Sequence, residues 1–594
     1  MMAKPRPACR GGRPTVGTAV FAVLILTGLS SAAGPEFEPR FDKLSNGLRI
    51  CIVEEHSQPL VSVQLWFRAG ASVDPPTLPG LSHVALTALV QSTTEPRPPL
   101  PTGWNRIHNT LPDANYIALL AGSAELDRCL AWSAAHFQTL KLTSNQLDVA
   151  RDAAALIWGG QPETMDQRKC RLLLAAMFPN HSYCNPPEFV GERLAGAESG
   201  TIEEFAARWF AVGNATLFVI GDITPAIALQ KIKERFGSIR WIDVPAPAEH
   251  PFPDNKHRYV QAPDSAVTFA WLVPPAGHMD RTIALVAREI LRQRLTRQWS
   301  SLESSTGASE ILSARDGSVI VLEEREPRPH APVEFESRLT QLARNGCLEF
   351  ELNRARKRIR RHECEAAFGF ENWSIQLAES EMVAGDILLA SLAPRQAALV
   401  GIADVQRAAR ELNNRTRRVA LIPESGDHRP PPEAPPVPGS PLRPMRHAAA
   451  TTPIESSRTV TYRMESGRLA NGVRWVNCTL PVSGFAQFRL AIHDDGAGRA
   501  PQLNWVRPVA FPSMKSFQDF LNYRGLKATV SPEPDGWSVT LDGLREETDA
   551  MIELLSAARR YSDGTFADSS RLEFTARGDF TVSECAALAQ KMTD

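Results

Sequence analysis

The sequence predicts an α+β fold made of repeated units, in which mixed or antiparallel sheets are covered by helices on one side. The first observation is an internal repeat, because LSNGLR at 44–49 recurs as LANGVR at 469–474, an offset of 425 residues. The second is that apolar and polar residues alternate after each copy, at 63–67 and at 488–492, which predicts strands with one buried face. A repeat of this extent indicates two related halves.

Residues 1–33 predict an export signal that is removed from the mature chain. Four basic residues precede an apolar segment from Val16 to Leu29, and small residues at 31–33 precede Gly34. The apolar segment is short for a membrane span. We therefore expect an exported protein, periplasmic or extracellular, with no stable membrane span after cleavage; an uncleaved signal would act as an anchor. Loss of the four basic residues changes the formal net charge from −1 to −5.

The first half divides into two predicted units. The first unit, residues 34–245, closes with the buried strand and Gly-Asp pair of NATLFVIGDIT at 214–224. The second unit, residues 246–424, starts with the strand SAVTFAWLV and contains a helix with a basic stretch from Arg354 to Arg361. Such a stretch on an amphipathic helix of an exported protein is typical of a solvated face, so we expect no nucleic-acid partner.

Residues 425–457 are a predicted linker, because their repeated prolines disfavour helix and sheet and favour the extended polyproline conformation. At about 3.1 Å per residue, about thirty residues reach roughly 90 Å. The third unit, residues 458–594, opens the second half. Its counterpart of the segment at 81–91 contains Pro508 and Pro512 and no His or Glu, which predicts a broken helix. This half is shorter than the first, and we expect it to be truncated or completed by a partner.

The segment LSHVALT at 81–87 carries a resemblance to a known family. It follows LSNGLR and two strands, and it thereby resembles the inverted-zincin family of insulinase, pitrilysin and the mitochondrial processing peptidases, in which L-x-N-G-L-R precedes H-x-x-E-H on a helix. In that motif two His bind zinc and the Glu polarises the attacking water. Here His83 stands at the first ligand position, Leu86 at the position of the base and Thr87 at the second ligand position.

The resemblance also implies a third ligand, a Glu on a later helix. The best match places Ile157 there, and Glu163 is a candidate substitute six residues further on. A catalytic zinc takes three protein ligands and a water, so two ligands without a base neither hold zinc tightly nor activate its water. We therefore expect no catalysis and no resident cofactor, with His83 as a remnant. The alternative is an active zinc metalloendopeptidase with non-standard ligands, His83 together with Glu163 or His108.

The resemblance implies two complete insulinase-like units and a partial third, in two halves that close around a peptide held as an added β-strand. The expected function is that of a non-catalytic partner of an active homologous peptidase subunit, shaping the chamber or binding peptides. The loop His181-Ser182-Tyr183 resembles a structural H-P-Y-G segment of the family. Eight cysteines follow the signal without any C-x-x-C spacing, which favours isolated thiols over a disulfide scaffold or a structural zinc site.

Overall fold

The computed structural model describes most of the chain in segments. These segments are residues 37–91, 104–137, 140–158, 165–179, 181–184, 197–244, 257–262, 267–275, 277–295, 310–324, 331–414, 418–423, 464–479, 484–493, 517–533, 536–558 and 572–593. The predicted signal, Glu163, the Pro-rich linker and the stretch with Pro508 and Pro512 lie outside them. Within the described segments, no helix is both long and apolar enough to cross a lipid bilayer.

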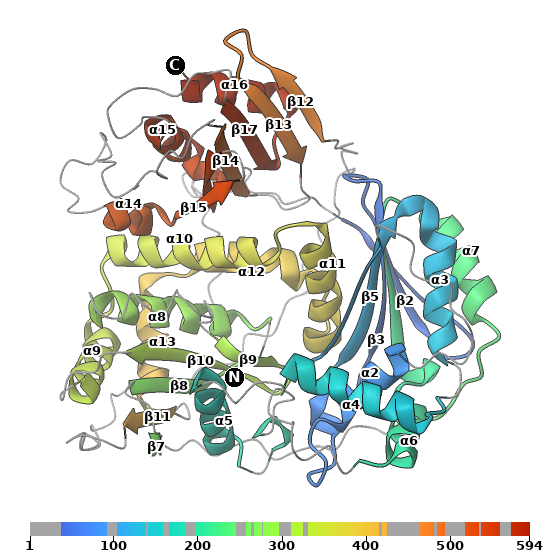
Figure 1. Cartoon of the computed structure of the whole chain (residues 1–594). Helices are drawn as coiled ribbons and strands as arrows, with labels where there is room; N and C mark the ends of the chain where they lie inside the picture. Colours follow the sequence, from blue (N-terminus) through green and yellow to red (C-terminus); the bar gives the residue numbers. More distant parts are fainter. Residues whose placement is uncertain are drawn as a thin grey trace, which may run out of the picture.

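The first sheet has six strands and a helical layer on one face (Figure 1). In spatial order its strands are β1 (Pro39–Lys43), β2 (Arg49–Glu54), β6 (Ala215–Gly221), β3 (Leu60–Phe67), β5 (Asn115–Gly122) and β4 (Asn105–Thr110). Strands β2 and β6 are parallel, and the other neighbours are antiparallel. One apolar core joins this sheet to α2 (Leu81–Gln91), α3 (Leu126–Ala134), α6 (Ser199–Trp209) and α7 (Pro225–Phe236).

The second sheet has five strands. Their order is β7 (His257–Ala262), β11 (Arg418–Pro423), β8 (Val267–Val273), β10 (Gly317–Glu324) and β9 (Glu310–Ala314). One face packs against α8 (Met279–Leu295), α9 (Ala331–Asn345), α10 (Glu349–Ala366), α12 (Leu389–Leu399) and α13 (Ile402–Asn414). The predicted alternation of strands and helices in this part of the chain is therefore present.

The second faces of these two sheets are covered by helices that the units exchange. Helix α5 (Met165–Met177) precedes the second unit in sequence, yet its Leu173 and Leu174 pack against β8, β10 and β11. Helix α11 (Phe370–Glu379) belongs to the second unit by sequence, yet its Trp373 and Leu377 pack against the first sheet. The prediction of helices on one side of each sheet was therefore wrong for the first two sheets, because each receives a helix from the other unit.

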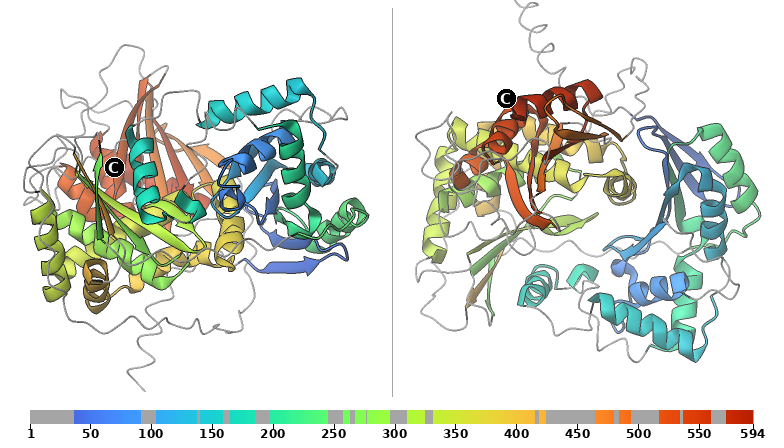
Figure 2. Two further views of the ribbon diagram at one scale, coloured as in Figure 1. Left: turned by 90° about the horizontal axis from the view of Figure 1, so that it is seen from below. Right: turned by 45° about the horizontal axis from the view of Figure 1, so that its top comes forward.

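The third sheet repeats the first strand for strand. Its order is β12 (Glu465–Arg468), β13 (Arg474–Thr479), β17 (Leu572–Gly578), β14 (Phe485–His493), β16 (Gly536–Leu544) and β15 (Lys527–Glu533). Its helices are α14 (Phe517–Arg524), α15 (Thr548–Ala558) and α16 (Val582–Thr593). Strand β13 starts 425 residues after β2, as the internal repeat predicts. Figure 2 shows this third unit, in orange and red, beside the yellow helices of the second.

The third unit is partial, as expected, although its sheet has all six strands. In the first unit, residues 123–214 separate β5 from β6 and contain α3, α4 (Ser144–Trp158), α5 and α6. In the third unit, only residues 545–571 separate β16 from β17. This connection contains α15, the counterpart of α3, and the remainder is too short for counterparts of α4, α5 and α6. The described part of this connection therefore contains no counterpart of α4, the helix on which the family's third zinc ligand is expected.

Candidate functional site

Helix α2 is held in place by an aspartate at its start. The backbone N–H groups of Gly80 and Ser82 donate to the two carboxylate oxygens of Asp74, at 2.5 and 2.8 Å. Such a cap satisfies N–H groups that have no partner within the helix. Burial raises the pKa of the Asp74 carboxyl to about 7, although the same hydrogen bonds act in the opposite direction. The capped start fixes the direction of α2 and hence the position of the LSHVALT segment.

The first predicted ligand, His83, is buried and tied to the sheet. Its Nδ1 lies 3.1 Å from the hydroxyl oxygen of Thr110 at the end of β4. The Thr110 hydroxyl donates its single proton to Oδ1 of Asn115 on β5, at 2.5 Å, so it accepts a hydrogen bond from His83. The imidazole therefore carries its proton on Nδ1 and its lone pair on Nε2.

Leu86 and Thr87, at the positions of the base and the second ligand, take part in packing and in a hydrogen bond within the helix. Leu86 is completely buried within the apolar core between α2 and the first sheet. Thr87 is also completely buried, and its hydroxyl donates to the backbone carbonyl of His83, at 2.9 Å. A threonine that bonds back to the preceding turn has its only proton engaged in the helix. Neither side chain can take a proton from a water molecule at neutral pH.

The two histidines nearest this site are kept neutral. Burial, and to a lesser degree the neighbouring His108, lower the pKa of His83 to about 4. Burial and the charge of Arg106 lower the pKa of His108, which lies on β4. The described residues include no group of three or more His, Cys, Asp or Glu side chains placed to hold a metal ion. One imidazole beside a leucine and a threonine does not fit the zinc site of the resembled family.

The helix expected to carry the third ligand is where the resemblance places it. Helix α4 packs against α2, and Ile157 lies in its last turn. The side chain of Ile157 lies outside the described part of the chain, as does Glu163 altogether. The helix that carries Ile157 therefore packs against the helix that carries His83, while the ligand position on α4 stays a prediction.

A serine, a histidine and an aspartate meet elsewhere in the first unit, and sequence analysis did not find them. His56 lies between Asp222 and Glu54, with its Nδ1 and Nε2 at 2.7 and 2.9 Å from their carboxylates. The hydroxyl of Ser123 donates to Asp222, at 3.1 Å. Because the serine is bonded to the aspartate and not to the histidine, this group lacks the serine-to-histidine contact of a hydrolytic triad. The available signal was that His56 and Asp222 each follow a strand of the parallel pair β2 and β6.

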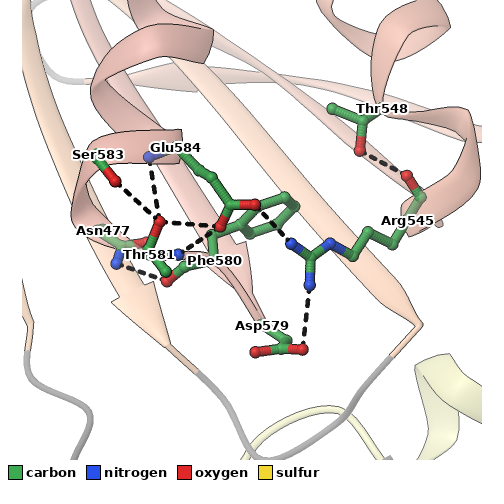
Figure 3. Close-up of polar contacts among 8 residues, drawn as sticks. All are labelled: Asn477, Arg545, Thr548, Asp579, Phe580, Thr581, Ser583 and Glu584. Atoms are coloured by element: carbon green, nitrogen blue, oxygen red, sulfur yellow. Dashed lines mark hydrogen bonds and ion pairs between the residues drawn. The ribbon is translucent and has the colours of Figure 1, made fainter. Parts of the chain in front are cut away.

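The equivalent place in the third unit holds an arginine (Figure 3). Asp579, at the end of β17, pairs with Arg545 at 3.0 Å, and the same guanidinium contacts Glu584 at 2.9 Å. The Arg545 guanidinium also lies over the Phe580 ring, 4.9 Å from its centroid. Thr581 and Glu584 exchange hydrogen bonds in a capping box that starts α16. Both carboxylates of this cluster contact Arg545, so the cluster ties strand ends to a helix start.

The loop His181-Ser182-Tyr183 joins the first two sheets. The Tyr183 hydroxyl donates to the carboxylate of Asp113, in the turn between β4 and β5, at 2.8 Å. Asp113 also accepts the backbone N–H of Arg315, in the turn between β9 and β10, at 2.8 Å. His181 lies 3.3 Å from Asp316 in the same turn. The loop therefore fixes two hairpin tips against each other, which supports the structural role that the resemblance implied.

The sequence and the fold are similar to those of known peptidases. Residues 199–346 match the family described as the peptidase M16 inactive domain. A protease from Helicobacter pylori is 16% identical over 66% of this chain and 100% of its own, with a TM-score of 0.53. The periplasmic protease PqqL from Escherichia coli is 13% identical over 95% of this chain and 77% of its own, with a TM-score of 0.54.

A solved M16 inactive domain from Pseudomonas fluorescens is likewise similar. It is 15% identical over 66% of this chain and 98% of its own, with a TM-score of 0.55. No curated protein sequence matches this chain. At these identities the solved structures establish a shared fold, and they leave the chemistry to be judged from the residues at the site.

Proposed function

We propose that this chain is a degenerate member of the insulinase-like family of peptidases and an exported protein without proteolytic activity. In this proposal it forms part of a peptide-binding chamber as the partner of an active homologous subunit. The observation that carries the proposal is the pair Leu86 and Thr87, which fill the positions of the base and the second ligand while buried and engaged in packing or hydrogen bonding. The export signal predicted at 1–33 and the periplasmic location of PqqL support export.

The edge of the first sheet supports peptide binding. Among the described strands, β4 lies at one edge of this sheet and has β5 as its single neighbour. An edge strand presents backbone donors and acceptors to an extended peptide, which binds as an additional strand. Helix α2 packs directly against β4. A peptide added to β4 would therefore lie beside the degenerate helix, where Leu86 and Thr87 supply no group that activates water.

The first test is the zinc content and peptide-cleaving activity of the purified mature protein. We expect no stoichiometric zinc and no cleavage of unfolded peptides. The variant Leu86→Glu/Thr87→His, which restores two family residues, is expected to bind zinc more tightly than the native protein. Leu86→Met is the matched control, because it retains an apolar side chain of similar volume. Stoichiometric zinc with chelator-sensitive cleavage by the native protein would instead favour the metalloendopeptidase that uses His83 with His108 or Glu163.

The second test addresses peptide binding. An unstructured peptide of about ten residues is expected to slow hydrogen exchange at the backbone amides of residues 105–110, because strand addition protects the edge of the sheet. Amides of β12, which lies at one edge of the third sheet, serve as the internal control. Protection of β12 with none in residues 105–110 would place the peptide elsewhere.

The third test addresses the partner. Crosslinking of the mature protein in an extract of its own secreted or periplasmic compartment is expected to capture a homologous peptidase with an intact H-x-x-E-H. Recovery of the protein as a monomer that binds peptide would favour a peptide-binding protein that acts alone, and recovery without peptide or partner would contradict the proposal.

A further inference from the structure

Helix α10 is anchored in the second unit by buried ion pairs on one side. Glu289 on α8 is almost completely buried and contacts Arg292 at 2.7 Å and Arg358 of α10 at 3.5 Å. Burial alone would raise the pKa of the Glu289 carboxyl, but the positive charges of Arg292 and Arg358 hold it well below its usual range. This contact links α8 to α10 through one buried carboxylate that Arg288, Arg292 and Arg358 share.

The other side of α10 faces the third unit. Lys357 and Arg360 stand one turn apart, so they project from the same side of the helix. Lys357 pairs with Glu547, and Arg360 pairs with Glu546 at 3.1 Å, both in the turn between β16 and α15. The prediction of a solvated basic face for residues 354–361 was therefore wrong, because this stretch lies between α8 and the third unit.

The polarity of the contact reverses further along α10. Glu365 accepts a hydrogen bond from Lys527 of β15, at 2.6 Å. The helix thus offers positive, positive and then negative charge, and the third unit offers the complementary order. Such an alternation fixes the register of two surfaces, because a shift of one turn would place like charges together. Gly525 allows the close approach, since a Cβ at this position would lie 3.2 Å from the Cβ of Lys357.

An apolar centre lies at the end of these ion pairs. The rings of Phe368, after α10, and Phe485, on β14, meet with their centroids 4.9 Å apart. Cys364 of α10 and Leu544 of β16 belong to the same buried cluster. The contact therefore combines aromatic packing at one end with ion pairs along the rest of the helix.

We propose that this side of α10, formed by Lys357, Arg360, Glu365 and Phe368, is a docking surface that holds the third unit of the same chain by charge complementarity. The surface selects a unit that presents an acidic turn, a lysine on the adjacent edge strand and an apolar strand start. The linker at 425–457 keeps the two parts on one chain, while the docking surface sets their arrangement. The inference is independent of zinc and peptide binding.

The experiment measures the radius of gyration of the full mature chain by small-angle scattering at about 0.1 M salt, where the Debye length is about 10 Å. The variant Arg360→Glu/Lys527→Glu reverses one member of each of two ion pairs. Like charges then face each other across the contact, and we expect the radius to rise by about 2 Å above the roughly 24 Å of a compact chain of this size. Near-ultraviolet circular dichroism checks that the variant remains folded.

Two controls separate docking from folding. Adding Glu546→Arg/Glu365→Lys to the first variant restores opposite charges in both pairs and is expected to return the radius to the native value. Asp549→Lys reverses the partner of Lys591, an exposed pair within the third unit that does not touch α10, and is expected to leave the radius unchanged. At about 1 M salt, where the Debye length is about 3 Å, the native protein and the first variant are expected to scatter alike.

Three outcomes would overturn the inference. The first is an unchanged radius in Arg360→Glu/Lys527→Glu. The second is an expansion that the reciprocal substitutions do not reverse, since the arrangement would then not depend on the paired charges. The third is a native protein with twice the monomer mass in light scattering and a radius that falls on dilution, since α10 would then hold the third unit of a second copy.

Discussion

The first and third sheets share one strand order and differ in the face turned away from their own helices. In the first sheet this face carries Tyr116, Leu120, Phe218 and Ile220, and it packs against α11. In the third sheet, the residues at the same register positions are Ser538, Asp542, Thr575 and Arg577. The face that packs against α11 is apolar, whereas the equivalent face of the third sheet is polar, and the charged helix α10 contacts β14 and β16 of that sheet.

The difference separates two requirements on a sheet. The strand order is determined by the helix-covered face, which is apolar in both copies and forms the main core of each unit. The polarity of the opposite face depends on what lies against it, because apolar residues left uncovered there would lose the free energy of burial. On the third sheet only the end near Phe485 and Leu544 remains apolar, and this end meets the region of Phe368 after α10.

The largest expected effect is a contrast between equivalent positions. Phe218→Ala is expected to lower the free energy of unfolding of the first unit by about 4 kcal/mol, because the ring is completely buried between the sheet and α11. Thr575→Ala, at the equivalent position of the third sheet, is expected to cost under about 1 kcal/mol. Urea unfolding of both variants measures the difference, and equal losses would contradict the comparison.

The next effect concerns pH and is expected only in the first unit. The pKa of His83 is about 4 in the folded protein against 6.5 for an ordinary histidine, so the unfolded chain binds the proton more tightly. Stability is therefore retained above pH 6.5 and lost as the pH falls toward 4, by about 3 kcal/mol. Unfolding of the native protein and of His83→Asn at pH 7, 5.5 and 4 measures this loss. A His83 titration near 6.5 by NMR would refute it.

Two equivalent glycines provide a test of what the copies share. Gly221 and Gly578 end β6 and β17 with φ of +137° and +139°, a region that disfavours side chains. A Cβ would lie 2.2 Å from the carbonyl oxygen of Leu60 in the first case and 2.6 Å from that of Phe485 in the second. We expect Gly221→Ala and Gly578→Ala each to cost about 2 kcal/mol or more, with the larger loss at Gly221. Thermal unfolding checks both, and Gly122→Ala, where a Cβ meets no close neighbour, is the control.

The smallest expected effect is a pH dependence of stability between pH 6 and 9 that the ion pairs of His56 have and those of Arg545 lack. Hydrogen bonds to Asp222 and Glu54 raise the pKa of His56 despite partial burial. Its stabilisation is complete below the ordinary pKa of 6.5 and is lost as the pH rises through the raised value. The partly exposed pair is expected to contribute about 1 kcal/mol or less. His56→Arg should remove this dependence between pH 6 and 9, because an arginine side chain stays charged over this range, and an unchanged pH profile would count against the bridge.

The sequence predicted what depends on local pattern. The Asn-Gly turns, the alternating strands and the repeat at 425 residues define the two six-stranded sheets, and the spacing within LSHVALT places His83, Leu86 and Thr87 on one short helix. The match over residues 199–346 and the shared fold support the family that the resemblance indicated.

The sequence could not predict the contacts between helices and strands that lie far apart along the chain. The sequences of α5 and α11 show an apolar face, but they do not show that this face packs against the sheet of the neighbouring unit. Likewise, Arg354 to Arg361 has the composition of a solvated face, and only the fold brings Glu289, Glu546 and Glu547 to it. His56 and Asp222 lie 166 residues apart, and their contact follows only once β2 and β6 are known to pair in parallel.

The exchange of α5 and α11 has a consequence for synthesis of the chain. The first sheet is complete in sequence at Gly221, but the helix that covers its second face ends at Glu379. Because the chain is synthesised from its N-terminus, Trp66, Tyr116 and Phe218 stay uncovered on the first sheet while the second unit is being made. During this interval the nascent chain exposes an aggregation-prone surface and is expected to depend on chaperones until α11 arrives.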